Sequence, residues 1–166
     1  MAKITLKGNP IHTSGELPAV GSKAPDFKLT QGDLSDVSLS NFAGKKKILN
    51  IVPSLDTGVC QTSMVQFNQK AADAGDAVIL TVSRDLPFAQ KRFCEDKGID
   101  KVIAAAEMRD RNFGAAYGLE ITDGPLAGVL ARAVVVIDES NTIRYTELVP
   151  EIVQEPNYDA ALAALG

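Results

Sequence analysis

Cysteine, histidine and long apolar runs are all scarce in this 166-residue chain, and each scarcity argues against a class of protein. No stretch approaches the ~18 consecutive apolar residues that a membrane-spanning helix needs. Residues 1–8 lack the apolar core of a signal peptide, so we expect a cytoplasmic protein. One histidine, His12, and two cysteines show no metal-ligand spacing, so we expect no metal site.

Positive charge is also in short supply. With 17 Lys and Arg against 21 Asp and Glu, the formal net charge is −4 at pH 7, and the sequence has no basic stripe. This balance argues against a nucleic-acid-binding protein. The single positive run, residues 45–47, is interpreted as a solvated loop before a strand. Length and composition predict one globular domain over residues 1–166.

The hydrophobic pattern predicts an N-terminal hairpin, divided by the turn dipeptide Gly8-Asn9, and then a series of strands and helices. Apolar runs bounded by turn residues predict strands, and segments with a cap residue or a closing glycine predict helices. The expected strands are residues 24–29, 36–39, 48–52, 77–83, 101–105, 130–137 and 142–148, and the expected helices are residues 60–72, 85–97, 110–118 and 157–165.

This order of elements predicts the fold class. Two β-α-β crossovers are followed by an antiparallel hairpin and a last helix. Crossovers of this kind place helices on the faces of a sheet. We therefore predict an α/β protein with a thioredoxin-like (peroxiredoxin) fold, in which helices flank a central mixed β-sheet and a β-hairpin comes first.

Cys60 lies where the apolar strand 48–52 gives way to a helix. A strand, a tight polar turn and a helix place this cysteine on the first helical turn. Free amide N–H groups and the positive end of the helix dipole favour a thiolate there. Thr57 is placed to bond the sulfur or a substrate, and Pro53 closes the strand and can shield the site from water. We interpret Cys60 as a nucleophile.

The sequence around Cys60 resembles a known family. A thioredoxin-type dithiol would need a second cysteine where Ser63 stands. Instead, residues 53–60 have the form Pro-x-x-x-Thr-x-x-Cys, which is similar to the active-site motif of the peroxiredoxins. The resemblance narrows to the bacterial thiol peroxidases, the atypical two-cysteine peroxiredoxins, at Ala24-Pro25-Asp26-Phe27, at residues 124–133 (Gly-Pro-Leu-Ala-Gly-Val-Leu-Ala-Arg-Ala) and at Cys94.

The resemblance implies a role for each site residue. Cys60 would be the peroxidatic cysteine, with Thr57 and Pro53 shaping its pocket and Arg132 completing the site. Cys94 would be the resolving cysteine, which condenses with the Cys60 sulfenic acid to form an intramolecular disulfide. The implied substrates are hydrogen peroxide and organic hydroperoxides. Thioredoxin is the implied reductant and a homodimer the implied assembly, and no flavin, haem or metal is implied.

Taken without the resemblance, the residues leave several points open. Arg132 lies in an apolar run, where a charge is costly unless paired, yet it could also face water from a strand end. Cys94 could be an ordinary buried cysteine of an amphipathic helix. The apolar side chains of Leu126, Val129 and Leu130 only weakly favour an alkyl hydroperoxide over hydrogen peroxide as the substrate. Two other functions stay open: a thioredoxin-fold disulfide oxidoreductase, and a non-catalytic binding or chaperone module.

Overall fold

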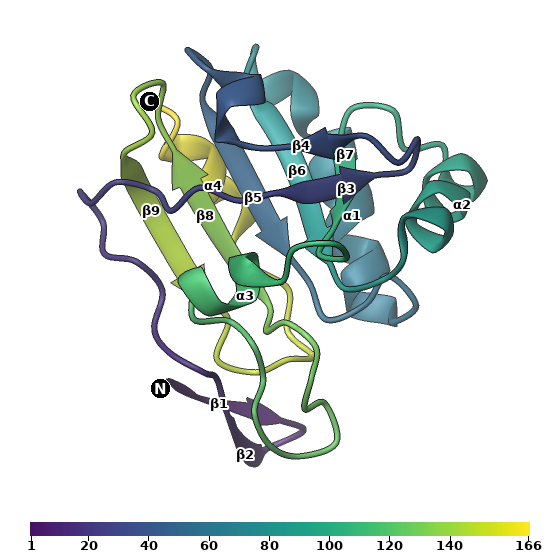
Figure 1. The fold of residues 1–166 in the computed structure, drawn as a ribbon, viewed down its shortest axis with the longest axis vertical. Coiled ribbons are helices and arrows are strands. Elements are labelled where there is room, and N and C mark those ends of the chain that lie inside the picture. Colours follow the sequence, from purple (N-terminus) through teal and green to yellow (C-terminus); the bar gives the residue numbers. More distant parts are fainter.

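A mixed sheet of seven strands runs through the middle of the molecule (Figure 1), with the strand order β4-β3-β7-β6-β5-β8-β9. The computed structural model describes residues 1–166. Its strands are β1 (Lys3–Leu6), β2 (Asn9–His12), β3 (Leu29–Gln31), β4 (Asp36–Val37), β5 (Lys47–Ile51), β6 (Val78–Ser83), β7 (Ile103–Ala106), β8 (Ala133–Ile137) and β9 (Ile143–Leu148). Its helices are α1 (Gly58–Gln69), α2 (Pro87–Lys97), α3 (Asn112–Ala116) and α4 (Tyr158–Ala163), with short 3₁₀ helices at Leu39–Phe42 and Ala71–Ala74.

The strand pairing confirms the predicted thioredoxin-like architecture. β5 pairs in parallel with β6, and β6 with β7, so that α1 and α2 are the two crossover helices. β8 pairs antiparallel with β5 on one side and with β9 on the other. β3 joins the far edge by antiparallel pairing with β7. The sheet is therefore mixed, as the order of elements predicts.

Alternate residues of the central strands face opposite layers of the core. Along β5, Leu49 and Ile51 belong to one hydrophobic cluster and Ile48 to the other. The cluster of Ile48 is completed by α1 and α4, through buried residues such as Met64 and Ala161. The other cluster is completed by the first 3₁₀ helix and α3, on the opposite face of the sheet. Helices thus cover both faces, which explains the continuous apolar runs of β5, β6 and β8.

Two interpretations of charged residues are wrong. Lys47 is fully buried in β5 rather than solvated, and its Nζ donates to Asn141 Oδ1 at 2.6 Å. Burial lowers the pKa of this lysine, although neighbouring carboxylates oppose the shift. Asp85 does not begin α2: the N-cap is Leu86, and no side chain caps the helix. In both cases a partner distant in sequence determines where the charged side chain lies.

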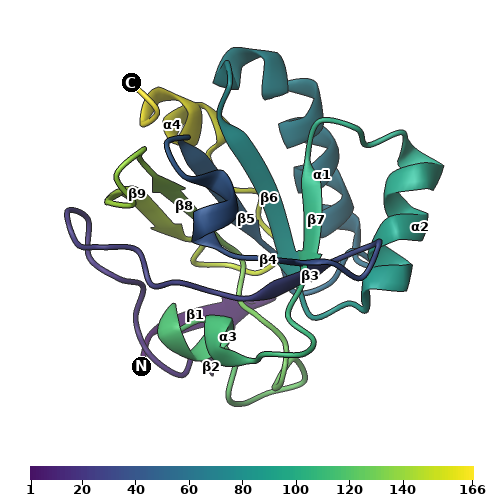
Figure 2. The same cartoon turned by 45° about the horizontal axis from the view of Figure 1, so that its top comes forward.

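The N-terminal hairpin of β1 and β2 forms a separate sheet, as predicted. It lies at the opposite end of the molecule from the C-terminus (Figure 2). Backbone hydrogen bonds attach it to the segment after β9: Thr5 N donates to Pro150 O at 2.9 Å, and Ile152 N donates to Thr5 O at 2.9 Å. This attachment brings the hairpin to the Cys60 site. No helix has the length and apolar character that crossing a membrane requires.

Candidate active site

Cys60 lies in the first turn of α1 and is fully buried. The N-cap residue, Thr57, has extended backbone angles of φ −116° and ψ 148° and caps no amide with its side chain. The amides of the first helical turn therefore remain available to a negative charge at this end of the helix. The Thr57 hydroxyl donates to the Ser54 carbonyl at 3.0 Å instead of to the Cys60 sulfur.

Arg132 is the partner of the Cys60 sulfur. Its Nη2 donates to Cys60 Sγ at 3.2 Å, and its Nε donates to Ile152 O at 2.9 Å. The side chain is only 1% exposed, which rejects the alternative in which Arg132 faces water. Its remaining nitrogen, Nη1, has no hydrogen-bond partner. A buried guanidinium with a free donor is suited to an incoming acceptor, because an unpaired buried donor is costly.

A pocket of about 250 Å³ opens beside this pair and borders Arg132. Pro53 and Thr57 line it, as the resemblance implies, and most of its other walls are apolar. Leu126 from the 124–128 loop also lines the pocket, whereas Leu130 is buried in the core and Val129 lies outside the lining. The complete lining consists of Leu6, Pro53, Thr57, Gly58, Val59, Leu126, Arg132, Ile152 and Val153.

Sequence reasoning missed the contribution of the segment after β9. The Ile152 carbonyl orients Arg132, and Ile152 and Val153 line the pocket. Glu151 fixes this segment: its carboxylate accepts from the amides of Gly8 at 2.8 Å and Val153 at 3.1 Å. These hydrogen bonds hold the pKa of Glu151 below its usual value. A backbone carbonyl has no sequence signature, so only the charged Glu151 could have drawn attention to this region.

Cys94 lies on α2, is half-buried, and does not line the pocket beside Cys60. It borders a different pocket of about 250 Å³, together with Lys91 and the turn between β3 and β4. Burial, aided by the negative charge of Glu95, raises the pKa of the Cys94 thiol. Both cysteines are free thiols. Cys94 packs against the apolar cluster that contains Cys60, but it borders a different pocket.

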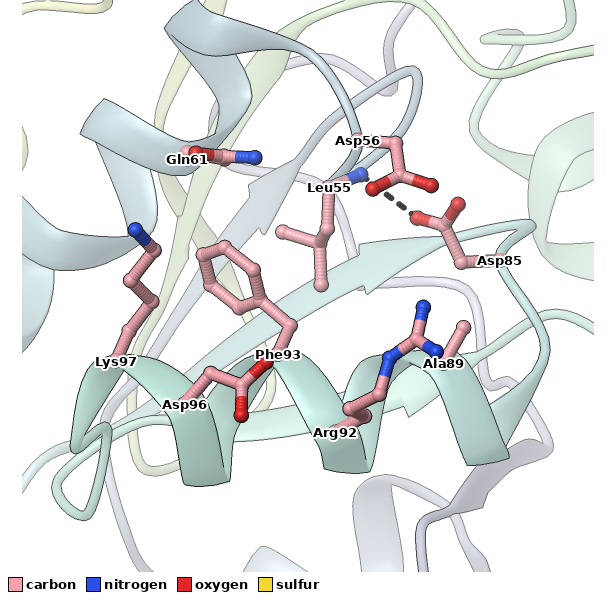
Figure 3. A pocket seen from close by; sticks show the side chains of 9 residues that line it. All are labelled: Leu55, Asp56, Gln61, Asp85, Ala89, Arg92, Phe93, Asp96 and Lys97. Carbon is pink, nitrogen blue, oxygen red and sulfur yellow. Dashed lines mark hydrogen bonds between the residues drawn. The ribbon is translucent and has the colours of Figure 1, made fainter.

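A third pocket, of about 150 Å³, lies between the two helices that carry the cysteines (Figure 3). Leu55 and Phe93 face it from opposite sides, and Asp85 closes one end. α1 and α2 are therefore not tightly packed against each other here.

No group of three or more His, Cys, Asp or Glu side chains in the structure is arranged to hold a metal ion.

The family model described as Redoxin matches residues 19–162. The chain belongs to this family. Redoxin proteins of similar sequence include the thiol peroxidase of Mycobacterium tuberculosis, which is 60% identical over 166 residues that cover 100% of this chain and 99% of the relative. The thiol peroxidase of Leptospira interrogans is 53% identical, covering 99% of this chain and 97% of the relative. These matches confirm the resemblance to thiol peroxidases over the whole chain.

Among solved structures, the redoxin fold of this chain is similar to that of a peroxiredoxin-like protein from Aquifex aeolicus. The TM-score is 0.92 at 40% sequence identity, covering 98% of this chain and 95% of that structure. This likeness confirms the α/β peroxiredoxin fold expected from the order of elements.

Proposed function

We propose that this redoxin protein is a thiol peroxidase in which Cys60 attacks hydrogen peroxide and organic hydroperoxides. The observation that carries the proposal is the 3.2 Å contact between Arg132 Nη2 and Cys60 Sγ, buried under a pocket that Pro53 and Thr57 line. A guanidinium stays protonated at all relevant pH values. It therefore stabilises a thiolate next to it, and a thiolate is the form of cysteine that attacks a peroxide.

The first step transfers one oxygen atom to Cys60. The thiolate sulfur attacks the distal peroxide oxygen and forms an S–O bond while the O–O bond breaks. The departing alkoxide or hydroxide takes up a proton and leaves as an alcohol or water. Negative charge moves from the sulfur toward the leaving oxygen, where the unpaired Nη1 of Arg132 can donate a hydrogen bond. Pro53 and Thr57 are proposed to shape the pocket around the peroxide.

The second step joins the two cysteines. The Cys94 sulfur attacks the sulfenic sulfur of Cys60, an S–S bond forms, and the sulfenic oxygen leaves as water. A disulfide requires Cα atoms within about 7 Å and side chains that point at each other. Cys60 is fully buried beside Arg132 on α1, and Cys94 lies on a different helix, α2. We therefore propose that the first turn of α1, part of α2, or both open before the bond forms.

The third step restores the dithiol. An external dithiol passes two electrons to the Cys60–Cys94 disulfide and becomes a disulfide itself, and we propose thioredoxin as this donor. Thioredoxin is kept reduced in the cytoplasm, where we place the enzyme. We also propose that residues 1–166 form one domain, because both hydrophobic clusters share the strands of a single sheet. The homodimer that the resemblance to thiol peroxidases implies is likewise a proposal.

The pocket lining bears on the choice of peroxide. Leu6, Leu126, Ile152 and Val153 surround Arg132 with apolar surface, which hydrogen peroxide cannot use. The alkyl group of an organic hydroperoxide would be removed from water against these side chains, at a gain of about 25 cal/mol per Å² of apolar area. We therefore propose that the enzyme accepts alkyl hydroperoxides as well as hydrogen peroxide.

Single-cysteine variants test this assignment. Cys60→Ser should abolish peroxide consumption, because the nucleophile is lost. Cys94→Ser should consume about one peroxide per chain and then stop with a sulfenic acid on Cys60. Mass spectrometry after dimedone trapping, together with peroxide consumption in the presence of thioredoxin, would measure both outcomes. Sustained turnover with thioredoxin by the Cys94→Ser variant would remove Cys94 from the resolving role.

A further inference from the structure

Asp85 directs its carboxylate at the turn that leads to Cys60. Its Oδ1 accepts from the Ser54 hydroxyl at 2.7 Å, and its Oδ2 accepts from the Leu55 amide at 2.8 Å. The same Oδ2 accepts from the Ser83 hydroxyl at 2.6 Å, at the end of β6. Figure 3 shows the carboxylate facing the Leu55 backbone nitrogen at one end of the pocket. Asp85 thus connects the turn to the sheet.

Within the turn, the other hydrogen bonds converge on Ser54. Its carbonyl accepts from the Thr57 amide at 3.2 Å and from the Thr57 hydroxyl at 3.0 Å. Its hydroxyl oxygen accepts from the Asp56 amide at 3.1 Å. The two hydrogen bonds that connect residues 53–57 to parts of the chain beyond α1 both end on Asp85. Asp85 therefore supplies every hydrogen bond that ties the turn to a part of the chain beyond α1.

We propose that Asp85 is a positioning residue that holds the 53–57 turn closed and so keeps Cys60 against Arg132. The closed turn maintains the 3.2 Å contact that peroxide reduction uses. It also opposes the disulfide step, because Cys60 is fully buried beside Arg132 and has to leave this position to meet Cys94 on α2. Asp85 therefore accelerates the first step and slows the second. This inference rests on the proposed two-step function.

The place of Asp85 in the chain lets it act on both cysteine-bearing segments. It stands just before α2 and is bonded to the turn just before α1. Beside it, a pocket of about 150 Å³ lies between the two helices, while Leu55 of the turn is buried in the apolar cluster that contains Cys60. Hydrogen bonds to an ionised acceptor are roughly twice as strong as neutral ones. A single carboxylate can therefore set how often the turn opens.

Three variants separate this role from general stability. Asp85→Ala removes all three hydrogen bonds. Asp85→Asn keeps one carbonyl oxygen for the Leu55 amide and offers its amide group to the Ser54 hydroxyl, which can also accept, so it retains part of the interaction. Asp56→Ala is the matched control: it removes a carboxylate from the same turn, but that carboxylate is exposed and its side chain makes no hydrogen bond.

The test measures the two steps separately in the full chain. Because the protein has no tryptophan, the reaction is quenched at short times and thiol, sulfenic acid and disulfide are counted by mass spectrometry. Asp85→Ala should slow sulfenic acid formation about tenfold and speed disulfide formation severalfold. Less sulfinic acid should then form in excess peroxide, because the sulfenic acid lives for a shorter time. Asp85→Asn should fall between this variant and wild type, and Asp56→Ala should match wild type.

Loss of stability alone would not move the two rates in opposite directions. If both rates change in the same direction in Asp85→Asn, or neither changes in either Asp85 variant, the positioning role is wrong. Asp85→Asn decides the matter should Asp85→Ala fail to fold, as circular dichroism would reveal. A wild-type protein that forms neither sulfenic acid nor disulfide would instead overturn the proposed function itself, and the two failures are thus distinguished.

Discussion

Replacing Arg132 by methionine removes the charge beside Cys60 and keeps a long side chain of similar reach. Two interactions are lost: the Nη2 contact with Cys60 Sγ at 3.2 Å and the Nε hydrogen bond to Ile152 O at 2.9 Å. The unpaired Nη1 donor disappears as well. The variant therefore tests whether this guanidinium both stabilises the thiolate and assists the leaving oxygen.

The expected loss of rate is large, because the site is buried. Removing one preorganised donor from a developing oxyanion costs about 10²–10³ in rate in well-studied enzymes. Arg132 is 1% exposed, so solvent cannot replace its donors. We expect the reaction of Cys60 with peroxide to slow by about 10²–10³, beyond any fall in the fraction of thiolate. Arg132→Lys should lose less, because it retains the charge but not the forked geometry.

The assay compares peroxide reactivity with the thiolate fraction, which the ultraviolet absorbance of the thiolate reports, over a range of pH. Arg144→Met is the matched control, since Arg144 lies on β9 with its side chain 56% exposed and pairs with Asp138 at 2.6 Å. A surface ion pair of this kind is worth about 0–1 kcal/mol, so the control should react like wild type. An Arg132→Met rate that equals wild type after correction for ionisation would refute the assignment.

Two further predictions concern the opening of the helices. Hydrogen exchange of residues 57–66 and 88–98 should be faster in the oxidised protein than in the reduced one, because disulfide formation unwinds part of α1 or α2; equal protection would show that the thiols were already apposed. Burial and the negative charge of Glu95 raise the pKa of Cys94. The protonated thiol therefore stabilises folded α2 fully below the ordinary cysteine pKa of about 8.5. This stabilisation is lost as the pH rises through the raised pKa. The rate of disulfide formation, measured by rapid quench, should therefore keep rising with pH beyond about 8.5. A rate that reaches a plateau below that pH would contradict the reasoning.

The sequence predicts those parts of the fold whose signals are local. The runs that become β5, β6 and β8 are apolar because helices cover both faces of the sheet. The strand, turn and helix around Cys60 place it on the first helical turn, and the structure has it there. The predicted terminal helix begins at Asn157, and in the structure this residue caps α4 by accepting from the Ala160 amide at 3.0 Å.

Long-range pairings could not be predicted in the same way. Arg132 meets Cys60 because its segment leads into β8, which pairs antiparallel with β5, and the residues alone left its exposure undecided. Lys47 is buried because Asn141, in the β8–β9 turn, accepts from its Nζ. Asp85 bonds the turn after β5 in place of its own helix, because three donors from the turn and β6 converge there. Each outcome depends on a partner that only the folded chain supplies.

The most direct test of the account is to treat the reduced wild-type protein with one equivalent of peroxide and map its cysteines by mass spectrometry without reduction. The account predicts an intramolecular disulfide that links the peptides of Cys60 and Cys94, with no flavin or metal added. A protein that consumes peroxide yet retains Cys94 as a free thiol, with Cys60 as a sulfenic acid or joined to another chain, would contradict it.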